Sequence, residues 1–228
     1  MDRRLFLTLS LLLPSVGVAG IRDWLAPVSG DESQATALRE LLSQGSIQAV
    51  ALLGRPDGYF ANPRVHIPLP ENLQRIEHTL RRLGQGGLAD EFVLSMNRAA
   101  ESAAPEAKAV FLEVVRGLSL RDAVDIVRGP DDAATRYLRI HADATLTNRF
   151  RPIVARATEQ VGVTARYKKL TRRATFAGGA LDLSRFDLDN YVTQRALDGL
   201  FVLIADEEQR IRHDPAARTT ELLRKVFK

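Results

Sequence analysis

The chain of 228 residues contains no cysteine. This absence excludes disulfide bonds, thiolate metal sites, a cysteine nucleophile and the lipid-anchored cysteine of a lipobox. The four histidines are His66, His78, His141 and His213, and no two of them have the spacing of a metal-binding pair. Without thiolates, a zinc site would need carboxylates from distant helices. We therefore expect no metal and no cofactor.

Several catalytic and nucleotide-binding patterns are also missing. The sequence has no Gly-x-Ser-x-Gly elbow and no phosphate-binding loop. The glycine-rich segment 84–87 has no predicted strand before it, so it indicates the end of a helix rather than a dinucleotide site. The net charge of +4 comes from 32 basic and 28 acidic residues. This mixture is too weakly basic for a nucleic-acid-binding protein.

Residues 1–19 have the pattern of a secretory signal peptide. A charged start precedes an apolar stretch, and Gly17-Val18-Ala19 supplies the small residues that a signal peptidase requires. We expect cleavage after Ala19, a flexible leader over residues 20–32 and a single helical domain over residues 33–228. An uncleaved N-terminal anchor is the alternative. The expected location of a cysteine-free exported protein of this kind is the periplasm.

Apolar residues recur with a period near 3.6 through most of residues 34–227, and no segment alternates with period two. Breaks at glycine and proline separate about nine helical segments, which predicts an all-α, multi-helix bundle. The helix near residues 190–212 contains six consecutive apolar residues, 200–205. Because two turns that are apolar all round have no polar face, we expect this helix to be buried at the centre of the bundle.

Proline, glycine and capping residues predict individual helix boundaries. Pro105 and Pro152 are expected to begin new helices, because proline is tolerated in a first helical turn. Asp189 is the preferred cap of the central helix, with Asp187 as the second choice. Gly45 weakens the helix expected over residues 34–53 and leaves two short helices as an alternative.

The segment 54–70 is the one long irregular stretch of the predicted domain. Its four prolines prevent a helix. Five apolar side chains can anchor it: Tyr59, Phe60, Val65, Ile67 and Leu69. We expect a strap that packs against the bundle, with a ligand-binding loop as the alternative.

Seven polar residues are candidates for a pocket between helices. They are Asn97, Arg98, Glu101, Asp131, Asp132, Arg136 and Asp198. They interrupt apolar helices or form charged pairs at helical spacing. If they converge, they would form a pocket for an anionic or zwitterionic ligand. The alternative is a set of surface ion pairs, each of which contributes only ~0.3–0.5 kcal/mol.

Five cations gather on one short predicted helix beside Tyr167. They are Arg166, Lys168, Lys169, Arg172 and Arg173. Such a helix could meet anionic lipid headgroups or other acidic groups of the cell envelope. It lacks the interleaved aromatic residues of a nucleic-acid-binding surface. An ordinary solvated face is the alternative.

Five long stretches resemble a known family. They are Asn62-Pro63-Arg64-Val65-His66-Ile67-Pro68-Leu69-Pro70, Ser95-Met96-Asn97-Arg98-Ala99-Ala100-Glu101, Gly129-Pro130-Asp131-Asp132-Ala133-Ala134-Thr135, residues 187–201 and residues 214–220. The resemblance is to the bacterial exported family catalogued as domain of unknown function 4197. It implies a secreted or periplasmic, mainly helical protein and implies no activity. Some members carry a lipobox cysteine, and this chain has none.

These observations favour a non-enzymatic module that binds an envelope partner or an apolar or amphipathic, lipid-like ligand between its helices. The alternative is a hydrolase or lyase whose carboxylates, Asp131, Asp132 or Glu101, converge in a cleft. A third hypothesis is peripheral contact with the membrane through the basic helix. We assign no catalytic residue, and the sequence leaves the oligomeric state open.

Overall fold

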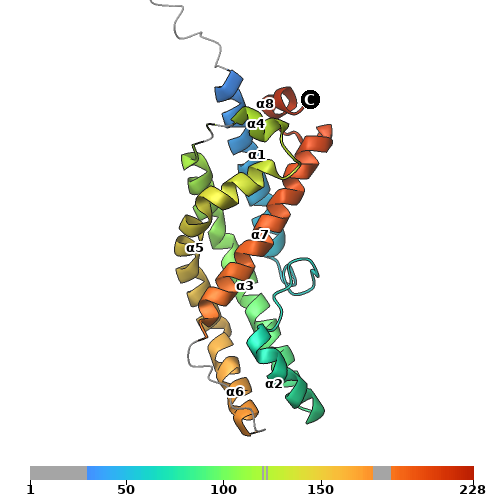
Figure 1. Cartoon of the computed structure of the whole chain (residues 1–228), viewed down its shortest axis with the longest axis vertical. Helices are drawn as coiled ribbons and strands as arrows, with labels where there is room; N and C mark the ends of the chain where they lie inside the picture. Colours follow the sequence, from blue (N-terminus) through green and yellow to red (C-terminus); the bar gives the residue numbers. More distant parts are fainter. Residues whose placement is uncertain (1–29, 120, 122, 177–185) are drawn as a thin grey trace, which may run out of the picture.

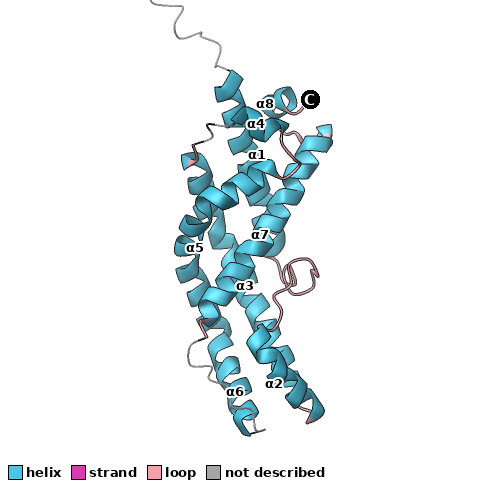
Figure 2. Ribbon diagram, viewed as in Figure 1, coloured by secondary structure: helices cyan, strands magenta, loops and turns pink. Residues whose placement is uncertain are grey.

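A computed structural model of the protein describes residues 30–119, 121, 123–176 and 186–228. The expected signal peptide and most of the expected leader lie outside these residues, so the division at residues 19 and 32 stays a prediction. The described chain contains α-helices and one 3₁₀ helix but no strand (Figure 2). The helices are α1 Gly30–Leu53, α2 Glu71–Arg82, α3 Gly87–Gly117, α4 Ala123–Arg128, α5 Ala133–Val161, α6 Val163–Phe176, α7 Leu188–His213, η2 Pro215–Ala217 and α8 Glu221–Val226. The predicted all-α class is confirmed, with eight α-helices instead of about nine.

The two longest helices contain the prolines that we expected to begin new helices. Pro105 lies inside α3 and Pro152 lies inside α5, so both boundary predictions are wrong. An interior proline costs roughly 3 kcal/mol, because it removes a backbone hydrogen bond and crowds the preceding turn. Side chains on both sides of each proline are buried, such as Ala104 and Ala107 in α3. Packing along one continuous helix therefore outweighs the local cost.

Helices α3, α5 and α7 run along the length of the molecule (Figure 1). Helix α3 packs against α1, α5, α6 and α7, and α7 packs against α1 and α5. The start of α1, together with α4 and α8, lies at one end of the bundle, and α2 and α6 lie at the other end. Among the described residues, no helix is both long enough and apolar enough to cross a membrane.

The apolar run of α7 lies against the core. Leu200, Phe201 and Ile204 are buried, and the other three residues of the run are partly buried. A Cβ atom added to Gly45 of α1 would lie 3.2 Å from the Ile204 Cγ2 atom. Gly45 therefore allows α1 and α7 to approach closely, and α1 is one continuous helix.

The ends of α7 differ from the expectation. Asp187, the second choice, is the N-cap, and its side chain accepts a hydrogen bond from the Asn190 amide at 2.9 Å. Asp189 instead accepts a hydrogen bond from the Thr158 hydroxyl at 2.7 Å, which links α7 to α5. Both aspartates suit a helix start. Asp187 is the N-cap because its carboxylate is the one that reaches the free Asn190 amide.

The strap, residues 54–70, packs against the bundle as predicted. Tyr59, Val65, Ile67 and Leu69 are buried, whereas Phe60 is 37% exposed. The Tyr59 hydroxyl donates a hydrogen bond of 2.7 Å to the Ala196 carbonyl of α7. Four of the five expected anchors therefore fix the strap, which lies at the side of the bundle near the middle of its length (Figure 1).

Candidate ligand-binding groove

Three of the seven candidate pocket residues hold the strap in place. Asn97 accepts a hydrogen bond from the Ile67 amide and donates one to the Ile67 carbonyl, both at 2.9 Å. Glu101 accepts hydrogen bonds from the Tyr59 and Phe60 amides at 3.1 Å. These contacts satisfy backbone groups that the irregular strap cannot pair with its own chain.

Arg98 completes this cluster on the outside of Glu101. Its guanidinium lies 2.6 Å from Glu101 and 2.7 Å from Asp57. The hydrogen bond to Glu101 is the main cause that raises the pKa of Arg98. Burial raises the pKa of the Tyr59 phenol strongly, and the Glu101 charge raises it further. The Glu101 side chain is only 5% exposed, and its carboxylate is occupied by its contacts with the strap and Arg98.

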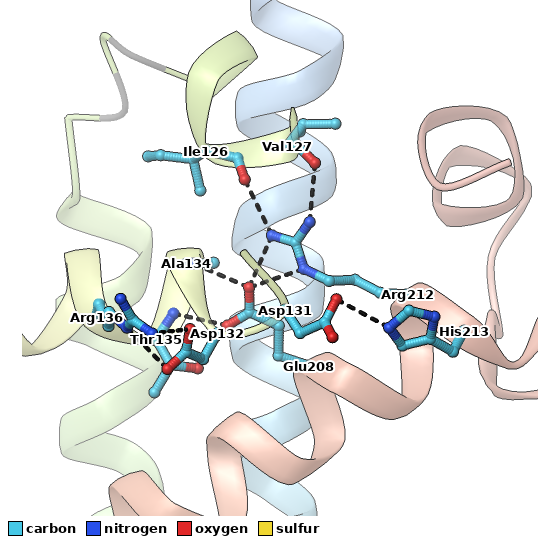
Figure 3. A network of polar contacts seen from close by, with 10 residues as sticks. All are labelled: Ile126, Val127, Asp131, Asp132, Ala134, Thr135, Arg136, Glu208, Arg212 and His213. Carbon is cyan, nitrogen blue, oxygen red and sulfur yellow. Dashed lines mark hydrogen bonds and ion pairs between the residues drawn. The ribbon is translucent and has the colours of Figure 1, made fainter. Parts of the chain in front are cut away.

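Three other candidates lie at the start of α5 (Figure 3). Asp132 forms a 2.8 Å ion pair with Arg136 one turn along the helix. Asp131 lies 2.8 Å from the His213 ring at the end of α7. All of these side chains are at least 37% exposed. They are surface pairs, which was the alternative interpretation for them.

The last candidate, Asp198, pairs with Arg139, whose guanidinium also lies 5.1 Å from the centre of the Phe201 ring. The seven residues therefore divide into three separate groups of contacts. Among the described residues, no hydrogen bond or ion pair joins Glu101 to Asp131 or Asp132, and each of these carboxylates has its own partner. This arrangement gives no support to a cleft built from those carboxylates.

The most buried charged pair was missed at the sequence level. Glu208 and Arg212 of α7 lie between the end of α4 and the start of α5 (Figure 3). Glu208 accepts hydrogen bonds from the Ala134 and Thr135 amides at 2.9 and 2.8 Å. Arg212 donates to the Val127 and Ile126 carbonyls at 2.8 and 3.0 Å.

The Glu208 carboxylate thus lies at the N-terminus of α5, and the Arg212 guanidinium lies at the C-terminus of α4. A helix carries partial positive charge at its N-terminus and partial negative charge at its C-terminus. The sequence signal was the spacing of four residues that places Glu208 and Arg212 on one face of α7. Within the described part of the chain, the hydrogen bonds and the ion pair of Glu208 and Arg212 are all made inside the fold, so we interpret the pair as structural.

The basic helix predicted from the sequence is α6. Lys168, Lys169, Arg172 and Arg173 are exposed. Arg166 differs from them, because its guanidinium donates a 2.6 Å hydrogen bond to the Val161 carbonyl at the end of α5. Four of the five predicted surface cations are therefore available to a partner.

The groove of interest lies along the outward face of α1, and none of the seven candidate pocket residues lines it. It has a volume of about 700 Å³, which is within the usual range for ligand sites. Residues one turn apart form its floor: Thr36, Glu40, Ser43 and Ile47. Their helical spacing explains why they share one side of α1 while Leu38 and Leu42 are buried on the other.

The two walls of the groove come from distant parts of the chain. On one side, Arg39 donates a 2.9 Å hydrogen bond to the Leu118 carbonyl, which holds the end of α3 and its Arg116 beside α1. On the other side, Gln44 donates a 3.1 Å hydrogen bond to the Ala217 carbonyl and so holds the C-terminal segment against α1. Leu223 of α8 adds an apolar side chain to this wall.

Arginine supplies most of the charge in the groove. Among the described residues, neither Arg39 nor Arg116 has a carboxylate within ion-pair distance, whereas Arg210 pairs with Glu207 at 2.6 Å. The Nε atom of Arg39 is buried and has no hydrogen-bond partner in the described structure. Such an atom costs about 1–3 kcal/mol unless a partner or a ligand satisfies it.

A smaller hollow of about 530 Å³ lies between the strap and α2. It contains His66 and His78, but His66 Nδ1 lies 2.8 Å from the Phe60 carbonyl oxygen. Both Glu77 and Asp90 at this hollow are paired with Arg81. Within the described ranges, no three side chains of His, Asp or Glu gather as metal ligands.

The family model for DUF4197, a protein of unknown function, matches residues 29–228. The chain belongs to this family. The resemblance noted in the sequence is therefore confirmed over all the described residues of this DUF4197 member. No curated protein and no solved structure matches the chain. The groove of the DUF4197 fold thus has to be interpreted from its own geometry.

Proposed function

We propose that this protein is an exported, non-enzymatic binding protein that holds an anionic amphiphile in the α1 groove. The ligand would have a carboxylate or phosphate head and an apolar tail. The signal-peptide pattern of residues 1–19 supports export to the periplasm, and the irregular strap is committed to packing. In the part of the chain that the structure describes, Glu101, Asp131 and Asp132 share no common site, which favours binding over the hydrolase or lyase alternative.

The observation that carries the proposal is the pair of arginines at the groove without carboxylate partners among the described residues. Arg39 and Arg116 both line the side of the groove where α1 meets the end of α3. An acidic head placed there could bind the guanidinium groups of both arginines. A hydrogen bond between charged groups contributes about 1.5–3 kcal/mol, which is about a tenfold or greater effect on affinity.

The apolar tail of the ligand would contact a different part of the groove from the acidic head. Ile47 is 37% exposed on the groove floor, and Leu223 lines the C-terminal wall. Covering apolar surface contributes about 25 cal/mol for each Å² removed from water. A ligand with both an anionic head and a tail therefore fits this groove better than a purely polar anion.

Fluorescence titration with dansylaminoundecanoate, an acidic amphiphile, tests the proposal. We expect saturable binding, and Arg116→Gln should weaken it about tenfold because one charge-assisted contact is lost. Arg128→Gln is the matched control, since Arg128 is exposed on α4 and does not line the groove. The neutral alcohol analogue should bind more weakly than the acid.

A second pair of variants separates the tail from the head. Ile47→Ser should weaken dansylaminoundecanoate, whereas Ile140→Ser, at an apolar residue 77% exposed on α5, should not. Equal affinity for the acid and the alcohol, or equal effects of the groove and control variants, would contradict the proposal. Failure to bind the acid at all would also contradict it.

A further inference from the structure

The exposed side of α6 is a continuous basic face. Helical geometry places successive residues about 100° apart, so Lys168, Lys169, Arg172 and Arg173 occupy an arc of roughly 140°. Leu170 points to the opposite side and is buried in the core. The burial pattern agrees with this geometry, because all four cations are exposed.

These positive charges are poorly compensated within the protein. Among the described residues, Lys169 has one acidic neighbour, Glu91, at 3.7 Å, and the other three cations have none within ion-pair distance. Helix α6 itself contains no acidic residue between Val163 and Phe176. The face therefore presents a local positive potential, although the net charge of the whole chain is only +4.

The chemistry of the face distinguishes between anionic partners. Tyr167 is partly buried against Phe92 and Phe186 and is therefore not on the exposed arc. Among the α6 side chains that the structure describes, no aromatic ring shares the arc with the cations, which gives no support to stacking of nucleic-acid bases. A row of exposed lysine and arginine side chains suits a broad layer of acidic headgroups. Binding to such a layer requires only contact between opposite charges, without deep insertion of side chains.

The position of α6 supports a role separate from the groove. It lies with α2 at one end of the molecule, whereas the start of α1 and α8 lie at the other end (Figure 1). The groove is built from α1, the end of α3 and the segment around α8. A surface that held α6 would therefore leave the groove uncovered.

We propose that the exposed face of α6 docks the protein on an anionic phospholipid surface. The contact is peripheral and electrostatic, and it includes Lys168 and Arg172, which have no acidic side chain within ion-pair distance among the described residues. Each cation near such a surface strengthens binding about fivefold. Binding falls with added salt, because exposed charges are screened within about 10 Å at moderate ionic strength.

Vesicle co-sedimentation of the purified protein tests this surface. The probe is a vesicle with about a third phosphatidylglycerol in phosphatidylcholine, compared with phosphatidylcholine alone. We expect binding to the acidic vesicle at low salt and release at high salt. The double variant K168E/R172E should lose at least about 25-fold in affinity, because two attractive charges are replaced by repulsive ones.

The matched control is K108E/K225E, which changes the net charge by the same amount. Lys108 on α3 and Lys225 on α8 are exposed, and neither has an acidic side chain within ion-pair distance in the described ranges. This control should retain affinity to within about twofold of the unchanged protein, since the contact depends on local charge. Circular dichroism of both variants checks that the helices are intact.

Three outcomes would overturn the proposal. They are equal binding to neutral vesicles, an equal loss in the control variant, and tighter salt-sensitive binding to soluble heparin than to acidic vesicles. The last result would assign the face to an anionic polymer. The groove variants Arg116→Gln and Ile47→Ser should leave vesicle binding unchanged. A failure of vesicle binding can therefore be distinguished from a failure of ligand binding in the groove.

Discussion

Arg212 Nη2 lies 2.8 Å from Glu208 Oε1, and the two side chains are 7% and 0% exposed. Each of them also binds backbone groups, Glu208 at the start of α5 and Arg212 at the end of α4. A buried pair is favourable only when hydrogen bonds satisfy both charges. Here the helix ends supply those bonds, so one pair fixes the positions of three helices.

Replacing Glu208 by alanine should destabilise the protein by about 3–5 kcal/mol, because a buried arginine and two amides of α5 would lose their partner. Glu208→Gln should cost less, since an amide can still accept one of the hydrogen bonds. Urea unfolding followed by circular dichroism measures both. Glu106→Ala, in the exposed pair with Arg156, is the control and should cost less than about 1 kcal/mol. Equal costs for Glu208→Ala and Glu106→Ala would contradict a structural role of the buried pair.

The strap should loosen locally when Glu101 is changed to glutamine. The charged acceptor of the Tyr59 and Phe60 amides is lost, and Arg98 loses its closest carboxylate. We expect the Tyr59 and Phe60 amides to exchange with deuterium at least about tenfold faster, because a hydrogen bond to a charged group contributes about 1.5–3 kcal/mol.

The control for the strap is Asp206→Asn, which weakens the exposed ion pair between α7 and Arg64 of the strap. Exchange at the Tyr59 and Phe60 amides should stay unchanged in this variant. Uniformly faster exchange across all helices in Glu101→Gln would show global destabilisation and contradict a local clamp.

Local patterns were sufficient for the helical class and for the strap. The 3.6 period and the absence of alternating segments predicted an all-α chain, and four prolines identified residues 54–70 as irregular. Pro105 and Pro152 misled the boundary assignment, because a local rule cannot account for burial along a whole helix. The resemblance of the motifs to DUF4197 added the family and no activity.

The polar sites could not be placed in the same way. Asn97 and Glu101 stand out in the sequence because they interrupt an otherwise apolar helix. Their partners are strap amides, and backbone groups leave no signal in a sequence. The groove floor reads as an ordinary polar face of α1. Its importance depends on Arg116, which reaches that face only through the packing of α3.

Gly199 marks a close approach between α7 and the strap. A Cβ atom there would lie 2.6 Å from Tyr59 Cε1 and 3.2 Å from Val65 Cβ. The Tyr59 ring cannot move freely, because its hydroxyl is bonded to Ala196. Gly199→Ala should therefore destabilise the protein by about 1–3 kcal/mol despite the higher helix propensity of alanine.

Thermal unfolding measures this effect, with Gly87→Ala as the matched control. Gly87 also lies in a helix, and an added Cβ atom would meet nothing within 4 Å. The control should be neutral or slightly stabilising, because alanine is favoured over glycine in helices. A stabilised Gly199→Ala protein would show that the strap shifts easily and does not clamp α7.

The same tyrosine should make the protein sensitive to alkaline pH. Burial, and then the Glu101 charge, raise the pKa of Tyr59 above its ordinary value of 10.0. The folded state therefore keeps the proton at a pH where the unfolded state releases it. This contribution to stability is complete below pH 10, and it is lost as the pH rises above 10 toward the folded-state pKa. The loss has a slope of up to about 1.4 kcal/mol per pH unit.

Tyr59→Phe isolates this contribution from the titration of lysines, which both proteins share. At neutral pH the variant should be about 1 kcal/mol less stable, because the hydrogen bond to the Ala196 carbonyl is lost. Above pH 10 its stability should fall less steeply than that of the unchanged protein, so the two curves should converge. Guanidinium unfolding at a series of alkaline pH values measures the difference. Parallel curves would mean that Tyr59 ionises without unfolding the strap, which its complete burial and its bond to α7 argue against.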